Sequence, residues 1–573
     1  MKMNILGIHT THDAGAALIS DGKIIAAVNE ERFNRIKHYG FLPINSIDYC
    51  LKKAGIGIED IDIIATSSSV LDPSLKLLFN LSDREISKVY PAFSQLGNLK
   101  ARIKSNIYKY LEPREVLPDY ISSFKIKDST KILPTDHHLA HAASAYYTSG
   151  FKEKCLVVSA DGVGDNISIA IYRGENGKLT LLKNYGIEGS LGLFYGMVTE
   201  SMGWWVGDGE PKTMGLAAYG DPNSFPDFIL KSFMPEYENG TLKKPYNYAK
   251  INRFKLFDCY HFHFSELSSI KRIKDTYGDK NIAAKAQYLL EKEMIELIGY
   301  WAKKEGVRRL ATSGGVFLNV KLNQKIVEAN IIDEYHVFPN AGDGGLALGA
   351  ALYQQFNICG EKNIPKLEHL FLGPEFSNYE VESILKGRNI PYEKVDDAAL
   401  MAAKLLAQGR IIGWFQGRME YGPRALGNRS ILADPRKKEN TNIINEKVKF
   451  REWFRPFCPS LLYEVAEDYF HTQREEFFMI TAYSVRKEKV NQIPAVVHVD
   501  GTSRPQLVKR QHNEKFWRLI KSFQDLTGTA VVLNTSFNIK GEPMILSPRD
   551  ALKCFFDTGI DNLIINDFLI SKD

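Results

Sequence analysis

Two histidines and two aspartates, far apart in the sequence, have the types and spacing that a divalent metal site needs. His137 and His141 stand four apart in DHHLAHAASAYY, which predicts a helix with both imidazoles on one face and His138 turned away. Asp161 ends an apolar strand at a glycine-rich turn, and Asp343 lies in NAGDGGLALGAA, at another strand-to-helix turn. Histidine pairs at this spacing are often structural, but two carboxylates at loop positions favour a site. The set suits a first-row metal acting as a Lewis acid, and iron(II), zinc and manganese all remain open.

Glycine turns at predicted helix starts indicate a nucleotide. In TSGGVFLN, Gly314 and Gly315 follow an apolar strand and allow close approach of a ligand to the backbone, and Asn319 follows at the helix start. One such junction is often structural, but residues 342–345 (GDGG) supply a second. A third segment, residues 207–220 (GDGEPKTMGLAAYG), predicts a flexible loop that could close over a substrate or phosphate.

Basic residues concentrate late in the chain, in GRMEYGPRALGNRSILADPR, VKFREWFRPF and DGTSRPQL. Aromatic residues and tight Gly-Pro turns around them predict that they are partly buried, and buried guanidinium groups need anionic partners. The sequence therefore predicts an anion site for phosphates. Its candidates are Arg418, Arg424, Arg429, Arg436, Lys449, Arg451, Arg455 and Arg504. The loop NTSFN, predicted at residues 534–538 after an apolar strand, adds the polar groups of Asn534 and Ser536.

The bulk composition excludes several classes of function. The 573 residues carry a net charge of +5 without a long Lys/Arg run, which argues against a nucleic-acid partner. No apolar stretch is long enough to span a membrane, and the start lacks the apolar core of a secretory signal. The six cysteines form no C-x-x-C pair, so neither a disulfide framework nor a thiolate zinc site is indicated. We therefore expect a cytoplasmic protein with no membrane and no nucleic-acid partner.

A repeated strand pattern positions the first group of residues. Predicted strands at 5–10, 15–19 and 23–28 form a meander, and a similar meander begins at Cys155. Helical segments follow each copy, so the sequence predicts a duplicated α/β domain with ligands bound between its halves. Residues 354–378 are rich in loop formers. We therefore place one domain at 1–355, a linker at 356–370 and a second α/β domain at 371–573.

The order of the motifs resembles one family over nearly the whole chain. HDAGAAL, EERF, DHHLAHAASA, DGVGD, GDGEPKTMGLAAYG, GGVFLN, GPRALGNRS, FREWFRPF and LNTSFN occur as in the antibiotic and nodulation O-carbamoyltransferases, the NodU/CmcH family that includes the tobramycin enzyme. The first part is also similar to tRNA threonylcarbamoyl transferases of the actin-like ATPase (ASKHA) superfold. The last part looks like the YrdC-type domain that makes carbamoyl-adenylates.

The resemblance implies an ATP-dependent carbamoyltransferase acting in two steps. Carbamoyl phosphate and ATP, with Mg²⁺, would bind in the C-terminal domain to Arg424, Lys449, Arg455 and Arg504. Carbamoyl-adenylate would then react in the first domain beside the metal, iron(II) by resemblance. The residues implied to hold this intermediate are Asp161, Gly192, Gly314, Gly315, Asn319 and Asp343. His12 matches the family's proposed general base, and Lys37 its acceptor contact.

Other functions remain open at this level. A small-molecule kinase of the actin-like superfold could use the same glycine turns, but it would need neither the His and Asp set nor the basic domain. Threonylcarbamoyl transfer to tRNA would call for a basic stripe. A nucleotide-binding sensor without catalysis is a further alternative. The hydroxyl acceptor, a natural product or sugar in secondary-metabolite or antibiotic biosynthesis, and the oligomeric state are left open.

Overall fold

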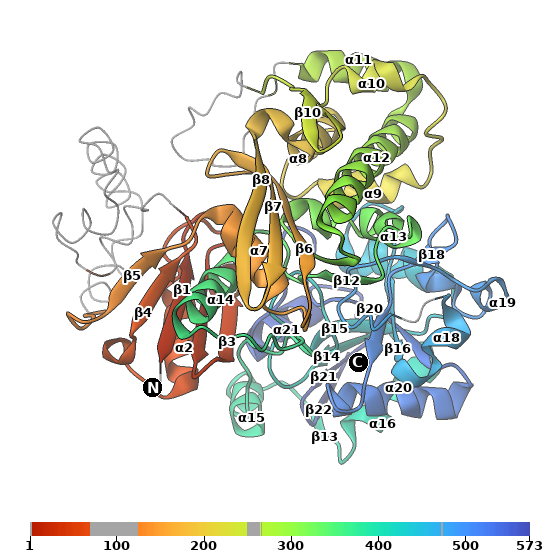
Figure 1. The fold of residues 1–573 in the computed structure, drawn as a ribbon. Coiled ribbons are helices and arrows are strands. Elements are labelled where there is room, and N and C mark those ends of the chain that lie inside the picture. The colour runs from red at the N-terminus through yellow and green to blue at the C-terminus, as the bar shows by residue number, and fades with distance from the viewer. Residues whose placement is uncertain are drawn as a thin grey trace. The chain divides into compact units, whose positions relative to one another are not determined.

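The computed structural model describes residues 3–68, 79, 124–248, 264, 266–471 and 474–572. These residues form two compact units, each built from several chain segments (Figure 1). Unit 1 comprises residues 1–192, 301–316 and 334–366, and unit 2 comprises residues 193–300, 317–333 and 367–573. The predicted domain limits of 1–355, 356–370 and 371–573 stay a prediction.

Unit 1 contains two five-stranded sheets with the same topology. The first has the order β3-β2-β1-β4-β5 and the second the order β12-β11-β6-β7-β8. In each, an antiparallel meander is extended by two parallel strands. This repeat confirms the predicted duplicated α/β domain. The strands are β1 (Asn4–His9), β2 (Gly15–Ser20), β3 (Lys23–Asn29), β4 (Ile63–Thr66), β5 (Lys131–Pro134), β6 (Cys155–Gly164), β7 (Ile167–Glu175), β8 (Lys178–Gly186), β11 (Arg309–Ser313) and β12 (Glu334–Val337).

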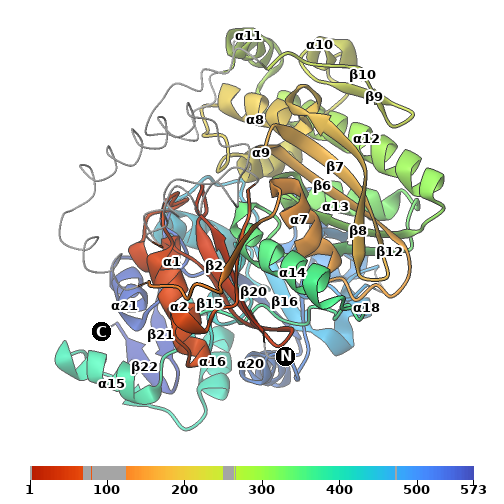
Figure 2. The same ribbon diagram turned by 60° about the vertical axis from the view of Figure 1, so that its left-hand side comes forward.

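Two small-residue helices pack tightly in unit 1. Helix α7 (His137–Tyr146) lies against α14 (Leu346–Cys359), as Figure 2 shows. A Cβ at Gly349 would lie 2.0 Å from the Ala140 carbonyl oxygen, so this contact requires glycine. Helix α14 continues past residue 354, where a loop was predicted, because Phe356 stacks on Tyr147 with ring centroids 4.0 Å apart. The remaining helices of at least four residues described in unit 1 are α1 (Glu31–Asn34) and α2 (Ile44–Ala54).

Unit 2 is built on a mixed eight-stranded sheet of order β13-β22-β21-β14-β15-β20-β16-β19. Helices α16 (Ala398–Ala407) and α20 (Glu514–Thr527) bury their apolar faces against it. This sheet confirms the second α/β body. The strands are β13 (Glu393–Lys394), β14 (Ile412–Phe415), β15 (Arg429–Ala433), β16 (Cys458–Leu462), β19 (Gln506–Val508), β20 (Val531–Ser536), β21 (Asn562–Ile565) and β22 (Phe568–Ser571).

Two loop predictions in unit 2 were wrong in their limits. Strand β20 extends through Ser536, since Ser430 to Ala433 of β15 pair with Ser536 to Leu533. Residues 210–217 form helix α9 (Glu210–Ala217), with Pro211 in its first turn. Other helices that lie wholly or mostly in unit 2 are α8 (Leu191–Ser201), α10 (Asp227–Lys231), α11 (Leu267–Tyr277), α12 (Asp279–Glu305), α13 (Val320–Glu328), α15 (Asn378–Gly387), α17 (Glu439–Ile443), α18 (Ala466–Tyr469), α19 (Lys487–Val490) and α21 (Pro548–Phe556). Within the described residues, no helix is both long and apolar enough to cross a membrane.

Candidate functional site

Unit 1 brings the four predicted metal ligands together. His137 and His141 project from α7, Asp161 from β6, and Asp343 from the short turn that precedes α14. One ligand atom of each lies within 4.8 Å of those of the others. The Nε2 atom of His141 is 3.2 Å from Asp161 Oδ2 and 3.4 Å from Asp343 Oδ1. We call these four residues the His–Asp cluster.

Local structure fixes the directions of the two imidazoles. Asp136 caps α7 by accepting a hydrogen bond from the Leu139 backbone N–H at 3.0 Å. His138 points to the other side, where its ring nitrogens contact Ser159 Oγ and the Ile167 carbonyl, as predicted. Gly164 lets β6 pass close to His137, because a Cβ there would lie 2.1 Å from the ring.

The chemistry of the cluster fits a divalent metal ion. His141 Nδ1 lies 3.3 Å from Ser313 Oγ, which leaves Nε2 as the nitrogen that faces the carboxylates. Burial opposes charge on His141, but hydrogen bonds and charges from Asp161 and Asp343 outweigh it and raise its pKa to about 9. Two imidazole nitrogens and two carboxylate oxygens form a donor set that suits iron(II), zinc or manganese.

Two further histidines of unit 1 border the cluster. The predicted base, His12, has Nε2 2.9 Å from Asp343 Oδ2. His9, at the end of β1, is buried, contacts Ser67 Oγ at 2.6 Å, and lies 3.9 Å from the same Asp343 oxygen. Burial lowers the pKa of His9 to about 4, so it is neutral. Sequence reasoning missed His9, although its spacing of three from His12 was a usable signal.

The predicted nucleotide-binding residues separate into two groups. Gly192, Gly314 and Gly315 lie around Asp161: a Cβ on each would fall 2.7 Å from Asp161 O, 2.1 Å from Ala160 O and 2.8 Å from Asp161 Oδ1 respectively. Gly314 also has φ +103°, which side chains rarely adopt. Asn319 belongs to unit 2, where it caps α13 and its amide pairs with Gln287. Their role with a nucleotide stays a prediction, as does acceptor binding by the half-buried Lys37.

Unit 2 gathers five of the predicted cations, Arg424, Lys449, Arg451, Arg455 and Arg504, which we call the cation cluster. Burial and then the charge of Arg504 lower the pKa of Arg424 to about 9. Burial and neighbouring arginines also lower the pKa of Lys449, Arg451 and Arg455. The positive charge of the cluster is therefore poorly compensated and should be relieved by a bound anion.

Members of the cation cluster differ in what they contact. Arg504 donates from Nε and Nη2 to Cys458 Sγ at 3.1 and 2.9 Å. Lys449 Nζ donates to Asn538 Oδ1 at 2.7 Å and to the Ser536 carbonyl. The Nε atom of Arg424 is buried without a hydrogen-bond partner. An incoming phosphate would find free donor capacity at Arg424 and would compete for Arg504 and Lys449.

Three of the predicted basic residues have structural partners instead. Arg429 is fully buried, donates to the carbonyls of Gln416 and Pro374, and stacks over the Phe415 ring at 3.6 Å. Arg418 donates to the Leu372 carbonyl at 2.6 Å. Arg436 forms an ion pair with Asp434 at 2.7 Å. These contacts account for the three side chains without an external anion.

The last two predicted anion-binding residues, Asn534 and Ser536, and the segment predicted to close over a substrate have partners within unit 2. Asn534 Nδ2 donates to Ser460 Oγ at 2.9 Å, and Ser536 Oγ donates to Asn538 Oδ1 at 2.8 Å. Lys212 of α9 lies 3.7 Å from Glu452, whose charge also acts on Arg455. The segment predicted to close over a substrate therefore packs beside the cation cluster.

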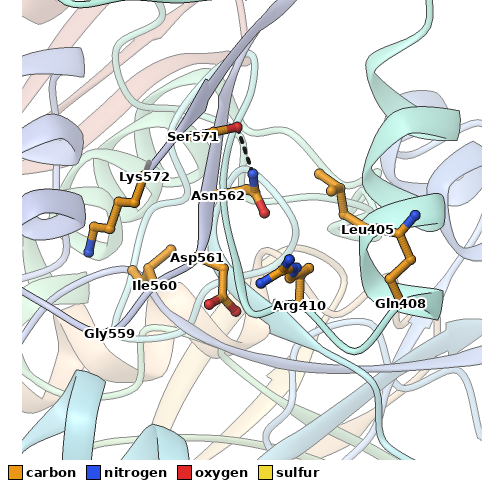
Figure 3. A pocket seen from close by; sticks show the side chains of 9 residues that line it. All are labelled: Leu405, Gln408, Arg410, Gly559, Ile560, Asp561, Asn562, Ser571 and Lys572. Atoms are coloured by element: carbon orange, nitrogen blue, oxygen red, sulfur yellow. Dashed lines mark hydrogen bonds between the residues drawn. The ribbon is translucent and has the colours of Figure 1, made fainter.

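A separate cavity of about 420 Å³ lies in unit 2 at the end of the sheet where β14 and β21 begin (Figure 3). Arg429 and Ser536 lie at the other end of these strands. None of the predicted site residues lines this cavity. Its lining residues are Leu405, Gln408, Arg410, Gly559, Ile560, Asp561, Asn562, Ser571 and Lys572.

Comparison with known proteins covers almost the entire chain. The family model described as the carbamoyltransferase N-terminus matches residues 4–352, and the carbamoyltransferase C-terminus model matches residues 403–572. Nodulation protein NolNO of Sinorhizobium fredii is 37% identical over 98% of this chain and 79% of its own length. Uncharacterized proteins of Synechocystis and Methanocaldococcus jannaschii are 35% and 34% identical, over 99% and 100% of this chain and 97% and 100% of their own lengths.

Proposed function

Because the chain belongs to the carbamoyltransferase family, we propose that it is an ATP-dependent O-carbamoyltransferase that works through carbamoyl-adenylate. Carbamoyl phosphate and water would give carbamate and phosphate. A carbamate oxygen would attack the α-phosphorus of ATP and release pyrophosphate. The carbamoyl group would then pass to a hydroxyl of a small molecule, such as a natural product or sugar, with release of AMP.

The observation that carries this proposal is the presence of two chemically different clusters, the His–Asp cluster and the cation cluster. Carbamoyl phosphate and ATP are both highly anionic and need cations to hold them, which the cation cluster supplies, including a buried Arg424 Nε without a hydrogen-bond partner. Transfer to a hydroxyl needs a polarised carbamoyl group and a base, for which the His–Asp cluster and His12 are placed. A simple kinase would use neither the four converging ligands nor a second anion site.

In the adenylation step, Arg424, Arg455 and Arg504 would hold phosphate oxygens and align the carbamate with the α-phosphorus. The flat guanidinium groups match phosphate oxygens in pairs, whereas Lys449 would act as a single buried charge. Mg²⁺ would accompany ATP. Lys449 would keep Ser536 close by through its contacts with Ser536 and Asn538.

In the transfer step, His137, His141, Asp161 and Asp343 would hold a divalent metal, iron(II) by family resemblance. When bound, this metal would supply Lewis-acid polarisation of the carbamoyl group. His12 would take the proton of the acceptor hydroxyl at Nε2, and Lys37 would contact the acceptor. The glycines around Asp161 let the backbone pack closely against this residue and so help to fix its position.

Exchange of labelled pyrophosphate into ATP tests the first step without knowledge of the acceptor. We expect exchange that requires both Mg²⁺ and carbamoyl phosphate, and a loss of at least about 100-fold in Arg455→Ala. Arg510→Ala is the matched control, since Arg510 is exposed and pairs with Glu514. Formation of ADP without exchange would contradict the proposal and favour a kinase.

A further inference from the structure

The residue that follows His12 has an unusual backbone. Asp13 adopts φ +60°, in the left-handed region that side chains other than those of asparagine and aspartate rarely adopt. Neighbouring groups hold this turn. Asn29 Nδ2 donates to the Asp13 carbonyl at 3.0 Å, and the backbone N–H of Ala14 donates to the Tyr39 carbonyl at 2.9 Å. The strained turn is thus fixed by the structure around it, which is typical of functional positions.

The carboxylate of Asp13 contacts two imidazoles, one with each oxygen. His12 Nδ1 is 3.2 Å from Asp13 Oδ2, and His38 Nδ1 is 2.8 Å from Asp13 Oδ1. His38 is also left-handed, at φ +58°, and its backbone N–H donates to Glu31 Oε2 at 2.9 Å. Two turns in rare conformations therefore meet at one carboxylate.

This contact determines which nitrogen of His12 faces the reaction site. An ionised carboxylate only accepts hydrogen bonds, so the proton of the shared bond must sit on His12 Nδ1. The other nitrogen, Nε2, faces Asp343 of the His–Asp cluster, 2.9 Å away. Asp343 is also a carboxylate and draws a second proton to His12 at Nε2, so Nε2 becomes the free basic nitrogen only when a metal ion takes up the charge of Asp343. The hydrogen bonds of both histidines also outweigh burial and lower the pKa of Asp13, which keeps it ionised.

We propose that Asp13 is a positioning residue for His12, and that His38 holds Asp13 in place. Asp13 keeps the proton on Nδ1 of His12 and orients the ring so that Nε2 faces the acceptor. His38 prevents the carboxylate from rotating away from His12. This inference rests on the proposed function, because it assigns His12 its role as base in the transfer step.

The tautomer of His12 gives a direct test that needs no acceptor. Protein labelled with ¹⁵N-histidine and loaded with zinc is compared with Asp13→Ala by two-bond ¹⁵N–¹H correlation spectra, with His12 assigned by loss of its signals in His12→Gln. We expect the Nδ1–H pattern for His12 in the wild type. In Asp13→Ala, a shift toward the Nε2–H form that free imidazoles favour is expected. An unchanged His12 pattern would overturn the proposal.

Kinetics supply the second test, with water as the surrogate hydroxyl. We expect Asp13→Ala to lower kcat for acceptor-independent AMP formation by about 100-fold, with the KM for ATP changed by less than about threefold. Asp13→Asn should lose less, since its single carbonyl oxygen can still accept from one imidazole. His38→Ala should lose about tenfold, because Asp13 would stay in reach of His12 but be less well held.

Asp21→Ala is the matched control. Asp21 also has a left-handed backbone, at φ +50°, but its Oδ1 accepts from the Met3 backbone N–H at 3.2 Å. It should leave the His12 tautomer and AMP formation unchanged. Absence of pyrophosphate exchange in the wild type would mean that the proposed function fails. Exchange together with full AMP formation by Asp13→Ala would mean that only the positioning role is wrong.

Discussion

The two clusters solve opposite electrostatic problems. In the His–Asp cluster, imidazoles and carboxylates compensate each other, so each charged form is stabilised: the pKa of His141 rises and that of Asp161 falls. In the cation cluster, burial and, after it, the charges of neighbouring arginines lower the pKa values of Arg424, Arg451 and Arg455. The first arrangement can exchange protons for a metal ion without changing its carboxylates. The second carries uncompensated positive charge, so its ligand should be an anion whose negative charge compensates it.

The variant with the largest expected effect distinguishes the roles of the two clusters by disabling the His–Asp cluster alone. His141→Ala removes a ligand from the His–Asp cluster and should abolish stoichiometric metal binding. Because Lewis-acid stabilisation is worth several kcal/mol, AMP formation should fall by about 1,000-fold. Pyrophosphate exchange should stay within about twofold, since it depends on the cation cluster. Metal content and both rates are measured on the same preparation.

Two further treatments check this result. His471→Ala, at an exposed histidine of unit 2, should leave metal content and AMP formation unchanged. Phenanthroline in the presence of excess Mg²⁺ should reproduce the loss of AMP formation in the wild type. If His141→Ala kept its metal and its rate, the His–Asp cluster would not be the metal site.

The reverse experiment disables the cation cluster. Arg504→Ala removes a guanidinium group that donates to Cys458 Sγ in this structure. Pyrophosphate exchange into ATP should fall by about 100-fold. Arg510→Ala is the control, since Arg510 is exposed and pairs with the exposed Glu514, and it should change exchange by less than about twofold. Equal losses in the two variants would show that the effect is general and would remove the distinction between the arginines of the cation cluster and other arginines.

The sequence predicts the two clusters unequally well. His137 and His141 follow from helical spacing, and Asp161 and Asp343 follow from turns after strands, because local periodicity and turn chemistry determine them. His9 was missed because its role depends on the place of β1 beside Asp343, which no local pattern encodes. Long-range pairing likewise decided that β20 continues through Ser536.

For the basic residues, the residue type alone does not separate function from structure. Arg429 and Arg424 stand five apart in one motif. Arg429 donates to backbone carbonyls and stacks on the Phe415 ring, whereas the Nε atom of Arg424 has no hydrogen-bond partner. Only the fold decides which guanidinium group finds internal acceptors. The duplicated sheets, by contrast, could be predicted, since each meander carries its own strand alternation and turn signals.

Anion binding should stabilise unit 2 measurably. Inorganic phosphate at 100 times its dissociation constant should add about 2.7 kcal/mol to the stability of the state that binds it. We expect the apparent melting midpoint to rise by several degrees, and Arg424→Ala to abolish most of this rise. Sodium chloride at equal ionic strength is the control. A rise of the same size in Arg424→Ala would place the bound phosphate elsewhere.

A buried carboxylate near the cation cluster behaves in the opposite way to Asp161. Glu476 is buried, and its Oε1 accepts backbone hydrogen bonds from Phe478 at 3.3 Å and Ile480 at 3.4 Å. Its side chain also hydrogen-bonds with Thr481. Burial raises its pKa to about 7, despite the charge of Arg504. The folded state therefore binds more protons than the unfolded state between about pH 4.5 and 7, and Glu476 becomes destabilising as the pH rises through this range.

Glu476→Gln should cancel this pH dependence while it keeps the hydrogen-bond acceptor. Relative to the wild type, the variant should gain about 2–3 kcal/mol in the free energy of unfolding on going from pH 5 to pH 8, because only the wild type must then bury a charge. Urea midpoints of unit 2, followed by tryptophan fluorescence at both pH values, measure this difference. Glu467→Gln, at an exposed position, should show the same small effect at both. A pH-independent difference for Glu476→Gln would mean that this carboxyl is already ionised at pH 5, and that the cation cluster compensates it as fully as the imidazoles compensate Asp161.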